Sequence, residues 1–166
     1  LLLIFTVGFP NLRQIPRRYL LAGSVLFVSY EICLALSLGL QTLTQEPAVR
    51  LSVNMSARSI GHEDWARTLA DGLRNRESIA ERLILEITES SAMGLADEVR
   101  PFMQDLQSRG ISFALDDFGA GYSSLARLRE LPFTELKIDR AYVTNCHTDR
   151  TNAGMLSTIV ELARRV

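Results

Sequence analysis

The stretch that decides the fold reads LILEITES at residues 83–90, ISFALDDFGAGYSSL at residues 111–125 and ELKID at residues 135–139. The first two pieces open with a short apolar run, of the length typical of a buried strand, and continue into charged or polar residues, whereas ELKID alternates charged and apolar residues. Helical patterns of apolar residues fill the intervals. Short buried strands that alternate with helices are typical of parallel βα units. The sequence therefore predicts an α/β fold, and both a doubly wound sheet and a (β/α)₈ barrel with outer helices fit it.

Extending this alternation along the chain predicts four strands and four helices. We expect the strands at residues 51–55, 83–88, 111–116 and 135–139, and the helices at residues 62–74, 97–109, 123–130 and 152–165. Gly110 follows the second of these helices, where a glycine commonly ends a helix. The length of 166 residues suits one domain with its own core.

Composition and charge narrow the functional classes. Hydrophobic residues make up 47% and charged residues 22% of the chain, which is typical of a globular protein. The formal net charge of -1 argues against a basic protein that binds a nucleic acid polymer. The two cysteines, Cys33 and Cys146, lie far apart and match no zinc-binding spacing. We therefore expect reduced thiols and a cytoplasmic protein.

The first part of the chain differs from the rest. Residues 19–40 read YLLAGSVLFVSYEICLALSLGL, a run that is long enough to span a bilayer but is interrupted by Glu31. A carboxylate near the middle of a membrane helix costs about 2.5–3.5 kcal/mol or more. The alternative is a buried strand or short helix, followed by a core helix at residues 32–43 that packs on the strand at residues 51–55. We favour this alternative over membrane attachment through residues 19–40.

Polar side chains recur at the ends of the predicted strands. They are Asn54, Glu86, Glu89, Asp116, Asp117 and Lys137, the last being the lone lysine of the chain. Each alone could have a structural role, such as capping a helix, forming a turn or pairing at the surface. In a parallel barrel, however, the carboxyl ends of the strands meet at the face that carries active sites. Together these residues predict a cluster of carboxylates, an amide and an ammonium at one face.

The predicted cluster has the chemistry of a divalent cation site. Clustered carboxylates are costly unless a cation neutralises them, and oxygen ligands without histidine or cysteine suit Mg²⁺ or Mn²⁺. Because neighbouring residues of a strand point to opposite faces, Asp116 and Asp117 can both meet a cation only where the strand ends and bends. Gly119 and Gly121 permit that bend. Such a pair suits phosphoryl hydrolysis with two cations, in which Lys137 would orient water or offset phosphate charge.

Five motifs resemble the EAL domain family and occur in its order: VNMS at residues 53–56, LEITES at 85–90, DDFGAGYSSL at 116–125, LPFTELKID at 131–139 and the AYV that follows. The resemblance covers about residues 32–166 and implies a (β/α)₈-type barrel that hydrolyses cyclic di-GMP to pGpG with Mg²⁺ or Mn²⁺. The residues that resemble its metal ligands are Asn54, Glu86, Asp116 and Asp117. Lys137 resembles the catalytic lysine, and Glu89 resembles the glutamate that steadies the loop after the paired aspartates.

The chain also departs from the family pattern. No EAL or EVL triplet occurs in residues 1–50, so the metal-binding glutamate of the first strand is missing. Because a (β/α)₈ barrel needs about 250 residues, this chain would supply about five of the eight units. We therefore divide it into an unassigned apolar segment, residues 1–31, and a partial EAL domain, residues 32–166.

Two functions follow from the resemblance. The first is a cyclic di-GMP phosphodiesterase of which this chain is an incomplete fragment, inactive on its own. The alternative is a catalytically inactive EAL-like module that binds cyclic di-GMP or a protein partner in second-messenger signalling. The resemblance also implies a homodimer formed through residues 122–130 and an upstream sensor or GGDEF domain in the parent protein.

Overall fold

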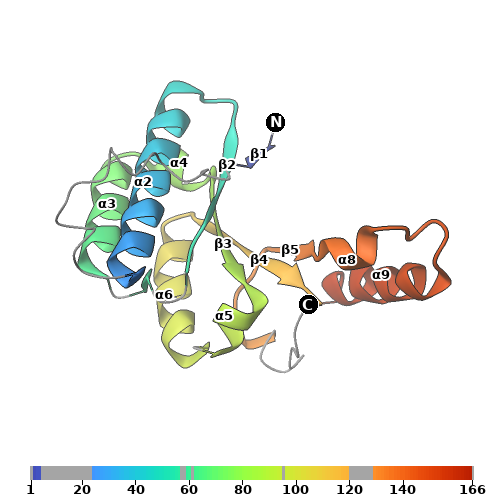
Figure 1. Cartoon of the computed structure of the whole chain (residues 1–166). Helices are drawn as coiled ribbons and strands as arrows, with labels where there is room; N and C mark the ends of the chain where they lie inside the picture. Colours follow the sequence, from blue (N-terminus) through green and yellow to red (C-terminus); the bar gives the residue numbers. More distant parts are fainter. Residues whose placement is uncertain are drawn as a thin grey trace.

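The computed structural model describes residues 2–4, 24–56, 59–60, 62–94, 96–119 and 129–165. Its framework is one sheet of five parallel strands, whose order in the sheet is also their order along the chain (Figure 1). The strands are β1 (Leu2–Ile4), β2 (Arg50–Asn54), β3 (Leu83–Thr88), β4 (Ser112–Phe118) and β5 (Glu135–Ile138). The four predicted strands thus lie side by side and parallel, which confirms the βα alternation.

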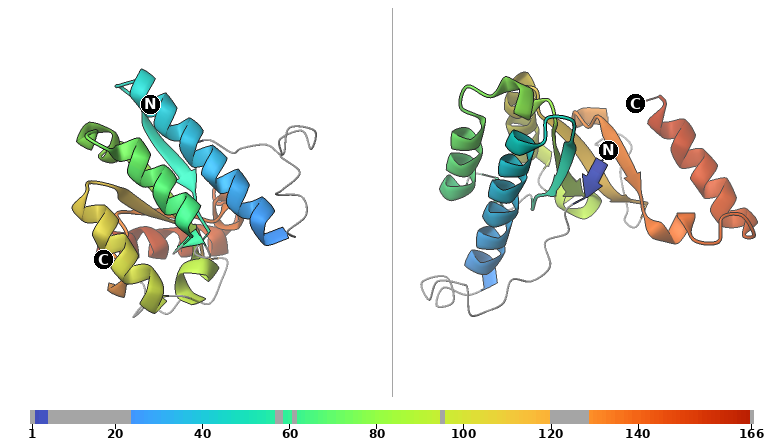
Figure 2. Two further views of the ribbon diagram at one scale, coloured as in Figure 1. Left: turned by 90° about the vertical axis from the view of Figure 1, so that its left-hand side faces the viewer. Right: turned by 90° about the horizontal axis from the view of Figure 1, so that it is seen from above.

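Helices follow the strands and lie mainly on one side of the sheet. They are α2 (Ser24–Gln45), α3 (Glu63–Leu73), α4 (Glu77–Ala80), α5 (Glu89–Gly94), α6 (Ala96–Ser108), α8 (Arg140–Val143) and α9 (Arg150–Ala163). Figures 1 and 2 show α2, α3 and α6 grouped against the sheet, whereas α8 and α9 extend away from them beyond β5. This arrangement of a parallel sheet with outer helices is part of a barrel.

The hydrophobic core lies between the sheet and the grouped helices. Every second residue of the central strands contributes to it: Leu51 and Val53 on β2, Leu83, Leu85 and Ile87 on β3, and Phe113 and Leu115 on β4. The helices add Leu36, Leu40 and Leu43 from α2, Trp65 and Leu69 from α3, and Val99, Met103 and Leu106 from α6. A period of two is the pattern of a strand with one face packed against helices. The intervening residues therefore belong to the opposite face.

The opposite face is concave and carries polar side chains. Arg50 on β2 and Glu135 on β5 form an ion pair of 3.2 Å between Nη2 and Oε1, although β3 and β4 lie between their strands. Side chains so far apart in the sheet can meet only if it bends around this face, as in a barrel. We call this the inner face. By the strand alternation it holds Arg50, Ser52, Asn54, Ile84, Glu86, Thr88, Ser112, Ala114, Asp116, Glu135 and Lys137.

The described part of the N-terminal apolar run, from Ser24 onward, lies in a helix that packs on the sheet. The predicted helix at residues 32–43 lies within α2, and a Cβ added to Gly39 would come within 2.6 Å of Leu51 Cδ2 on β2. In the described part of the chain, no helix is both long enough and apolar enough to cross a membrane. The helix expected at residues 32–43 and its packing on the strand at residues 51–55 are confirmed, whereas the separate strand or short helix expected before it is wrong, because α2 already begins at Ser24 and continues without a break.

The other strands and helices can be compared with their predicted bounds. β1 joins the sheet from the unassigned segment, with Leu2, Leu3 and Ile4 in register with Arg50, Leu51 and Ser52. β4 continues two residues beyond its predicted end at Asp116, to Phe118. Gly110 ends α6 with a φ of 95°, which confirms the predicted glycine cap. Most of the predicted helix at residues 123–130, and with it the expected dimer surface, lies outside the described residues.

Candidate functional site

Glu86 is the centre of the site. It lies in the middle of β3, points to the inner face and is 2% exposed. Lys137 Nζ, reaching across from β5, and Ser52 Oγ, on the neighbouring strand β2, both donate hydrogen bonds to Glu86 Oε1. A buried carboxylate requires a counter-charge and hydrogen-bond donors, and these two groups supply them. Lys137 thus pairs with Glu86 instead of its sequence neighbours Glu135 and Asp139.

Those two neighbours have other partners. Glu135 pairs with Arg50, as described above, and the Asp139 carboxylate accepts a hydrogen bond of 2.6 Å from Ala141 N at the start of α8. Asp139 therefore caps a helix. The ammonium of Lys137 therefore lies on the inner face, beside several carboxylates. Lys137 is the lone lysine of the chain.

The paired aspartates lie where β4 bends. The pairing of β4 with β5 shifts register between Leu115 and Phe118, and Asp117 has a φ of 55°. Asp and Asn tolerate this left-handed conformation better than most residues. The bend leaves Asp116 half-buried and Asp117 exposed at the same end of the strand. The expectation that the strand bends at the paired aspartates is confirmed.

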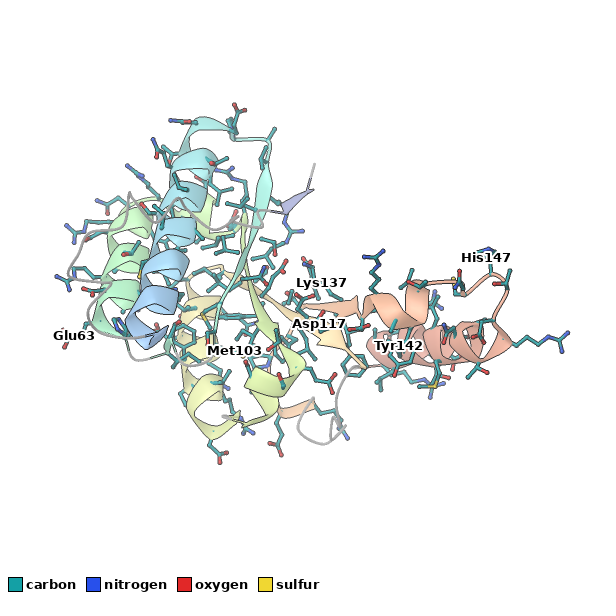
Figure 3. The ribbon with its side chains drawn as sticks, viewed as in Figure 1. Glu63, Met103, Asp117, Lys137, Tyr142 and His147 are labelled. Carbon is teal, nitrogen blue, oxygen red and sulfur yellow. The ribbon has the colours of Figure 1, made fainter. Side chains whose placement is uncertain are left out.

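Like charges surround Asp117. Desolvation, followed by the carboxylates of Asp116 and Asp139, raises the pKa of the Asp117 carboxyl above its ordinary value, and the Lys137 ammonium opposes this change. Figure 3 shows Asp117 and Lys137 close together at the ends of β4 and β5. One ammonium thus faces several carboxylates. This local excess of negative charge favours the approach of a cation.

The turn after the paired aspartates is held from two sides. Glu89, 3% exposed at the start of α5, accepts a hydrogen bond of 2.8 Å at Oε2 from Gly119 N. The hydroxyl of Tyr142 on α8 donates a hydrogen bond of 2.8 Å to Gly119 O. Gly119 has a φ of 100°, and a Cβ there would lie 2.6 Å from Tyr142 Cε2, so only glycine fits. The turn is therefore fixed to both α5 and α8.

Asn54 ends β2 at the same edge of the sheet. It is in register with Glu86 on β3, just as Thr88 is in register with Asp116 on β4. Parallel pairing thus brings the carboxyl ends of three strands together. The Asn54 side chain is exposed there. All six predicted site residues lie on β2 to β5 or at the start of α5, towards one end of the sheet.

The donor set of this edge fits a hard divalent cation in kind, because its oxygens come from carboxylates and an amide. Among the described residues, however, no three His, Cys, Asp or Glu side chains are close enough to hold one metal ion. β1, the strand beside Asn54, contributes only Leu2, Leu3 and Ile4. The first strand therefore brings no carboxylate from its described residues. The cation-binding role of Asn54, Glu86, Asp116 and Asp117 stays a prediction.

Two residues of the site were not singled out from the sequence. Ser52 lies two positions before Asn54, so the strand alternation already placed it on the same face. Its burial at 2% could not be read from the sequence. Tyr142 stands in the AYV that follows LKID, but its contact with Gly119 depends on how α8 returns toward β4. Both contacts join residues that are distant along the chain.

Comparison with known proteins identifies the motif-bearing part of the chain. The model of the EAL domain family matches residues 28–166. The chain is 39% identical over 114 residues to the bifunctional diguanylate cyclase/cyclic di-GMP phosphodiesterase MucR of Pseudomonas aeruginosa. That match covers 69% of this chain and 17% of MucR, so the chain spans about a sixth of that relative's length.

Solved structures support the same comparison. The PaMucR phosphodiesterase in complex with c-di-GMP superposes with a TM-score of 0.68 at 33% identity, covering 85% of this chain and 57% of that chain. The manganese/cy-diGMP complex of BlrP1 from Klebsiella pneumoniae gives a TM-score of 0.73 at 24% identity, covering 87% and 38%. The second likeness shows the fold alone. Both structures agree with a partial barrel.

A separate similarity concerns a short stretch. The chain is 87% identical over 39 residues to the aromatic amino acid exporter YddG of Escherichia coli, a match that covers 24% of this chain and 13% of that protein. A match over 39 residues shows a likeness of one stretch of the chain and does not show a family.

Proposed function

The chain belongs to the EAL domain family, and from this premise we propose that it carries the central part of a cyclic di-GMP phosphodiesterase site. The reaction of the complete site is hydrolysis of cyclic di-GMP to pGpG. The observation that carries the proposal is the inner-face pair of Glu86 and Lys137 beside the bent Asp116-Asp117 segment. The proposal is supported by relatives such as the bifunctional diguanylate cyclase/cyclic di-GMP phosphodiesterase MucR and the cyclic di-GMP phosphodiesterase NbdA.

In this proposal, oxygen ligands for divalent cations, Mg²⁺ or Mn²⁺, come from Asn54, Glu86, Asp116 and Asp117. Two bound cations would supply activation of a water and stabilisation of the leaving oxygen. The bend at Asp117 allows adjacent carboxylates to serve one edge of the sheet. The buried Glu86 needs little reorganisation to act as a ligand, because its position is already fixed by hydrogen bonds.

The protein's own groups orient the reactants. Lys137 is 26% exposed at its side chain, so its ammonium can hold a water or a phosphate oxygen while it remains beside Glu86. Glu89 acts as a positioning residue. Through Gly119 N it fixes the turn that carries the paired aspartates.

A second function is favoured by one specific observation. The three described residues of β1 are apolar, so the strand next to Asn54 offers no carboxylate. A site with fewer ligands holds cations less firmly, whereas the polar groups at the strand ends can still bind a dinucleotide. The chain alone would then be an inactive EAL-like module that binds cyclic di-GMP or a protein partner.

A graft tests whether the residues of this chain are competent for catalysis. Residues 50–143 would replace the matching segment of MucR, and formation of pGpG from cyclic di-GMP would be measured with Mg²⁺ and with Mn²⁺. We expect the graft to be active. Lys137→Ala and Asp116→Asn in the graft should each lower kcat by roughly 10²–10³-fold, because each removes a group that acts on developing charge.

The matched control in the graft is Arg74→Ala. Arg74 forms an exposed ion pair with Asp71 on α3, away from the inner face, and its loss should leave pGpG formation unchanged. A folded graft that hydrolyses cyclic di-GMP equally well with Lys137→Ala would contradict the assigned roles. A folded graft that binds cyclic di-GMP without hydrolysing it would favour the inactive module.

A further inference from the structure

We propose that Ser52 is a positioning residue for Glu86, whose carboxylate it holds from the β2 side. This inference rests on the proposed function for its meaning, because Glu86 is there assigned as a cation ligand. The contact itself does not depend on that assignment. Ser52 and Glu86 are each 2% exposed, and Ser52 Oγ donates to Glu86 Oε1 on the neighbouring strand.

The geometry of the sheet makes this contact specific. Ser52 is in register with Ile84, and Asn54 is in register with Glu86, so Ser52 reaches Glu86 diagonally across the inner face. A residue one position away on β2 would point to the helices, as Leu51 and Val53 do. Position 52 is therefore the place from which β2 can donate to the buried part of Glu86.

Both donors act on the same oxygen. Ser52 Oγ and Lys137 Nζ contact Glu86 Oε1, and Oε2 takes part in neither contact. The carboxylate is thus fixed through one oxygen from two strands, β2 and β5, and Oε2 is the oxygen that we assign to a cation. A neutral hydroxyl keeps this hold without adding a charge that would repel the cation. Hydrogen bonds of this kind to ligating carboxylates commonly tune metal affinity.

The alternative is that Ser52 is simply a small residue in a crowded place. In that case Ala would serve as well as Ser, because it is smaller and buries no polar group. The hydroxyl argues against this alternative, because a buried hydroxyl is costly unless it is hydrogen-bonded, and the bond it makes is to a charged carboxylate. Comparing Ala with Thr, which keeps the hydroxyl, separates the two explanations.

The experiment uses the complete 166-residue chain and exploits its lone lysine. With ¹⁵N-labelled lysine, the metal-free chain gives one side-chain ammonium signal by NMR, and this signal reports the environment of Lys137 beside Glu86. We expect Ser52→Ala to move this signal and speed its exchange with water, because Glu86 loses its second anchor. Ser52→Thr should restore the wild-type signal. Ser112→Ala, on the inner face of β4 and without a hydrogen bond to Glu86 or Lys137 in the described part of the chain, is the matched control.

A second arm measures Mn²⁺ affinity by electron paramagnetic resonance on the same variants. Ser52→Ala should weaken Mn²⁺ binding by roughly 10–100-fold, with Ser52→Thr close to wild type. Thermal unfolding of each metal-free variant shows whether the fold is kept. The inference is overturned if Ser52→Ala leaves the lysine signal unchanged, or if Ser52→Thr behaves like Ser52→Ala while both variants remain folded.

Failure of the proposed function is recognised separately, with Glu86→Gln. If wild type binds no Mn²⁺, or if Glu86→Gln binds it as wild type does, the assignment of Glu86 as a ligand is wrong. The lysine signal then still decides whether Ser52 positions Glu86. If Glu86→Gln abolishes binding and Ser52→Ala does not weaken it, the assignment of Glu86 stands and the role of Ser52 is rejected.

Discussion

Asp117 combines two features that are each unfavourable to the fold. Its backbone adopts the left-handed conformation, at a φ of 55°, and its carboxylate faces those of Asp116 and Asp139. We expect Asp117→Asn to raise the Tm of the metal-free chain at neutral pH by about 1–3 °C, because Asn tolerates the conformation and carries no charge. Thermal unfolding in the presence of a chelator measures this. Cation binding should weaken in the same variant.

The sign of the pH dependence follows from the raised pKa of Asp117. A carboxyl that binds its proton more readily when folded destabilises the fold while it is charged, so its contribution to stability decreases as pH rises through the raised pKa. The advantage of Asp117→Asn should therefore be largest at neutral pH and disappear in acid. Glu161→Gln, an exposed carboxylate on α9, serves as control. A lower Tm for Asp117→Asn at neutral pH would contradict the charge argument.

At the residue scale, the sequence predicted which residues lie near one another at the candidate site better than it predicted which side chains they contact. Asn54, Glu86, Asp116 and Lys137 were located because polar residues at strand ends interrupt apolar runs. The partner of Lys137 was not predictable, because Glu135, Asp139 and Glu86 were all available until the curvature of the sheet was known. Ser52 was missed for the same reason, since its burial depends on a neighbouring strand.

At the element scale, Arg82 attaches the N-terminal helix to the rest of the domain. Its guanidinium donates to the carbonyl oxygens of Leu43 at 2.6 Å, Glu46 at 2.9 Å and Val49 at 3.0 Å, and thus joins the end of α2 to the start of β2. Arg82→Ala should lower the free energy of unfolding by roughly 2–3 kcal/mol and the Tm by about 5–10 °C. Denaturant and thermal unfolding measure these changes.

Two variants test whether the planar guanidinium is responsible. Arg82→Lys should recover only a minor part of the loss, because an ammonium cannot span several carbonyl groups as the guanidinium does. Arg74→Ala, in an exposed pair with Asp71, should cost less than about 1 kcal/mol. Equal stability of Arg82→Ala and Arg74→Ala would mean that the carbonyl contacts of Arg82 contribute little.

The bounds of some strands were predicted more accurately than those of others, and the differences have physical reasons. β3 matched its predicted bounds, because six largely apolar residues between polar ones are a strong strand pattern. β1 escaped prediction, because three apolar residues within a longer apolar segment have no period. A bend at the adjacent aspartates was predicted, but the strand was expected to end there, and neither its continuation to Phe118 nor the left-handed conformation of Asp117 was predicted.

At the scale of the whole molecule, the outer helices and the inner face of the sheet differ in what they require of the sequence. On the outer side, α2, which follows β1, packs on β2 through Gly39. The helix serves as an outer barrel helix because that position requires only an apolar face and a small residue at the crossing. The inner face requires specific oxygen ligands, and the described residues of β1 bring none.

This asymmetry leads to the last prediction, that the 166-residue chain alone forms no measurable pGpG from cyclic di-GMP with Mg²⁺ or Mn²⁺. Among its described residues, no three acidic, histidine or cysteine side chains gather at one point, and the five-stranded sheet is open at β1 and β5. Water activation depends on ligand geometry, and a displacement of about 1 Å can cost on the order of 10²-fold in rate.

Chromatography of the nucleotide products measures this outcome, with the MucR graft as the positive control at equal protein concentration. The chain should stay at least about 10²-fold below the graft, because it has the same residues 50–143 but an open sheet and no carboxylate from the described residues of its first strand. Circular dichroism must show that the chain is folded under the assay conditions. Robust pGpG formation by the chain, lost on Asp116→Asn, would mean that β2 to β5 hold the cations without a carboxylate from the first strand. The inner face described here would then be sufficient for catalysis.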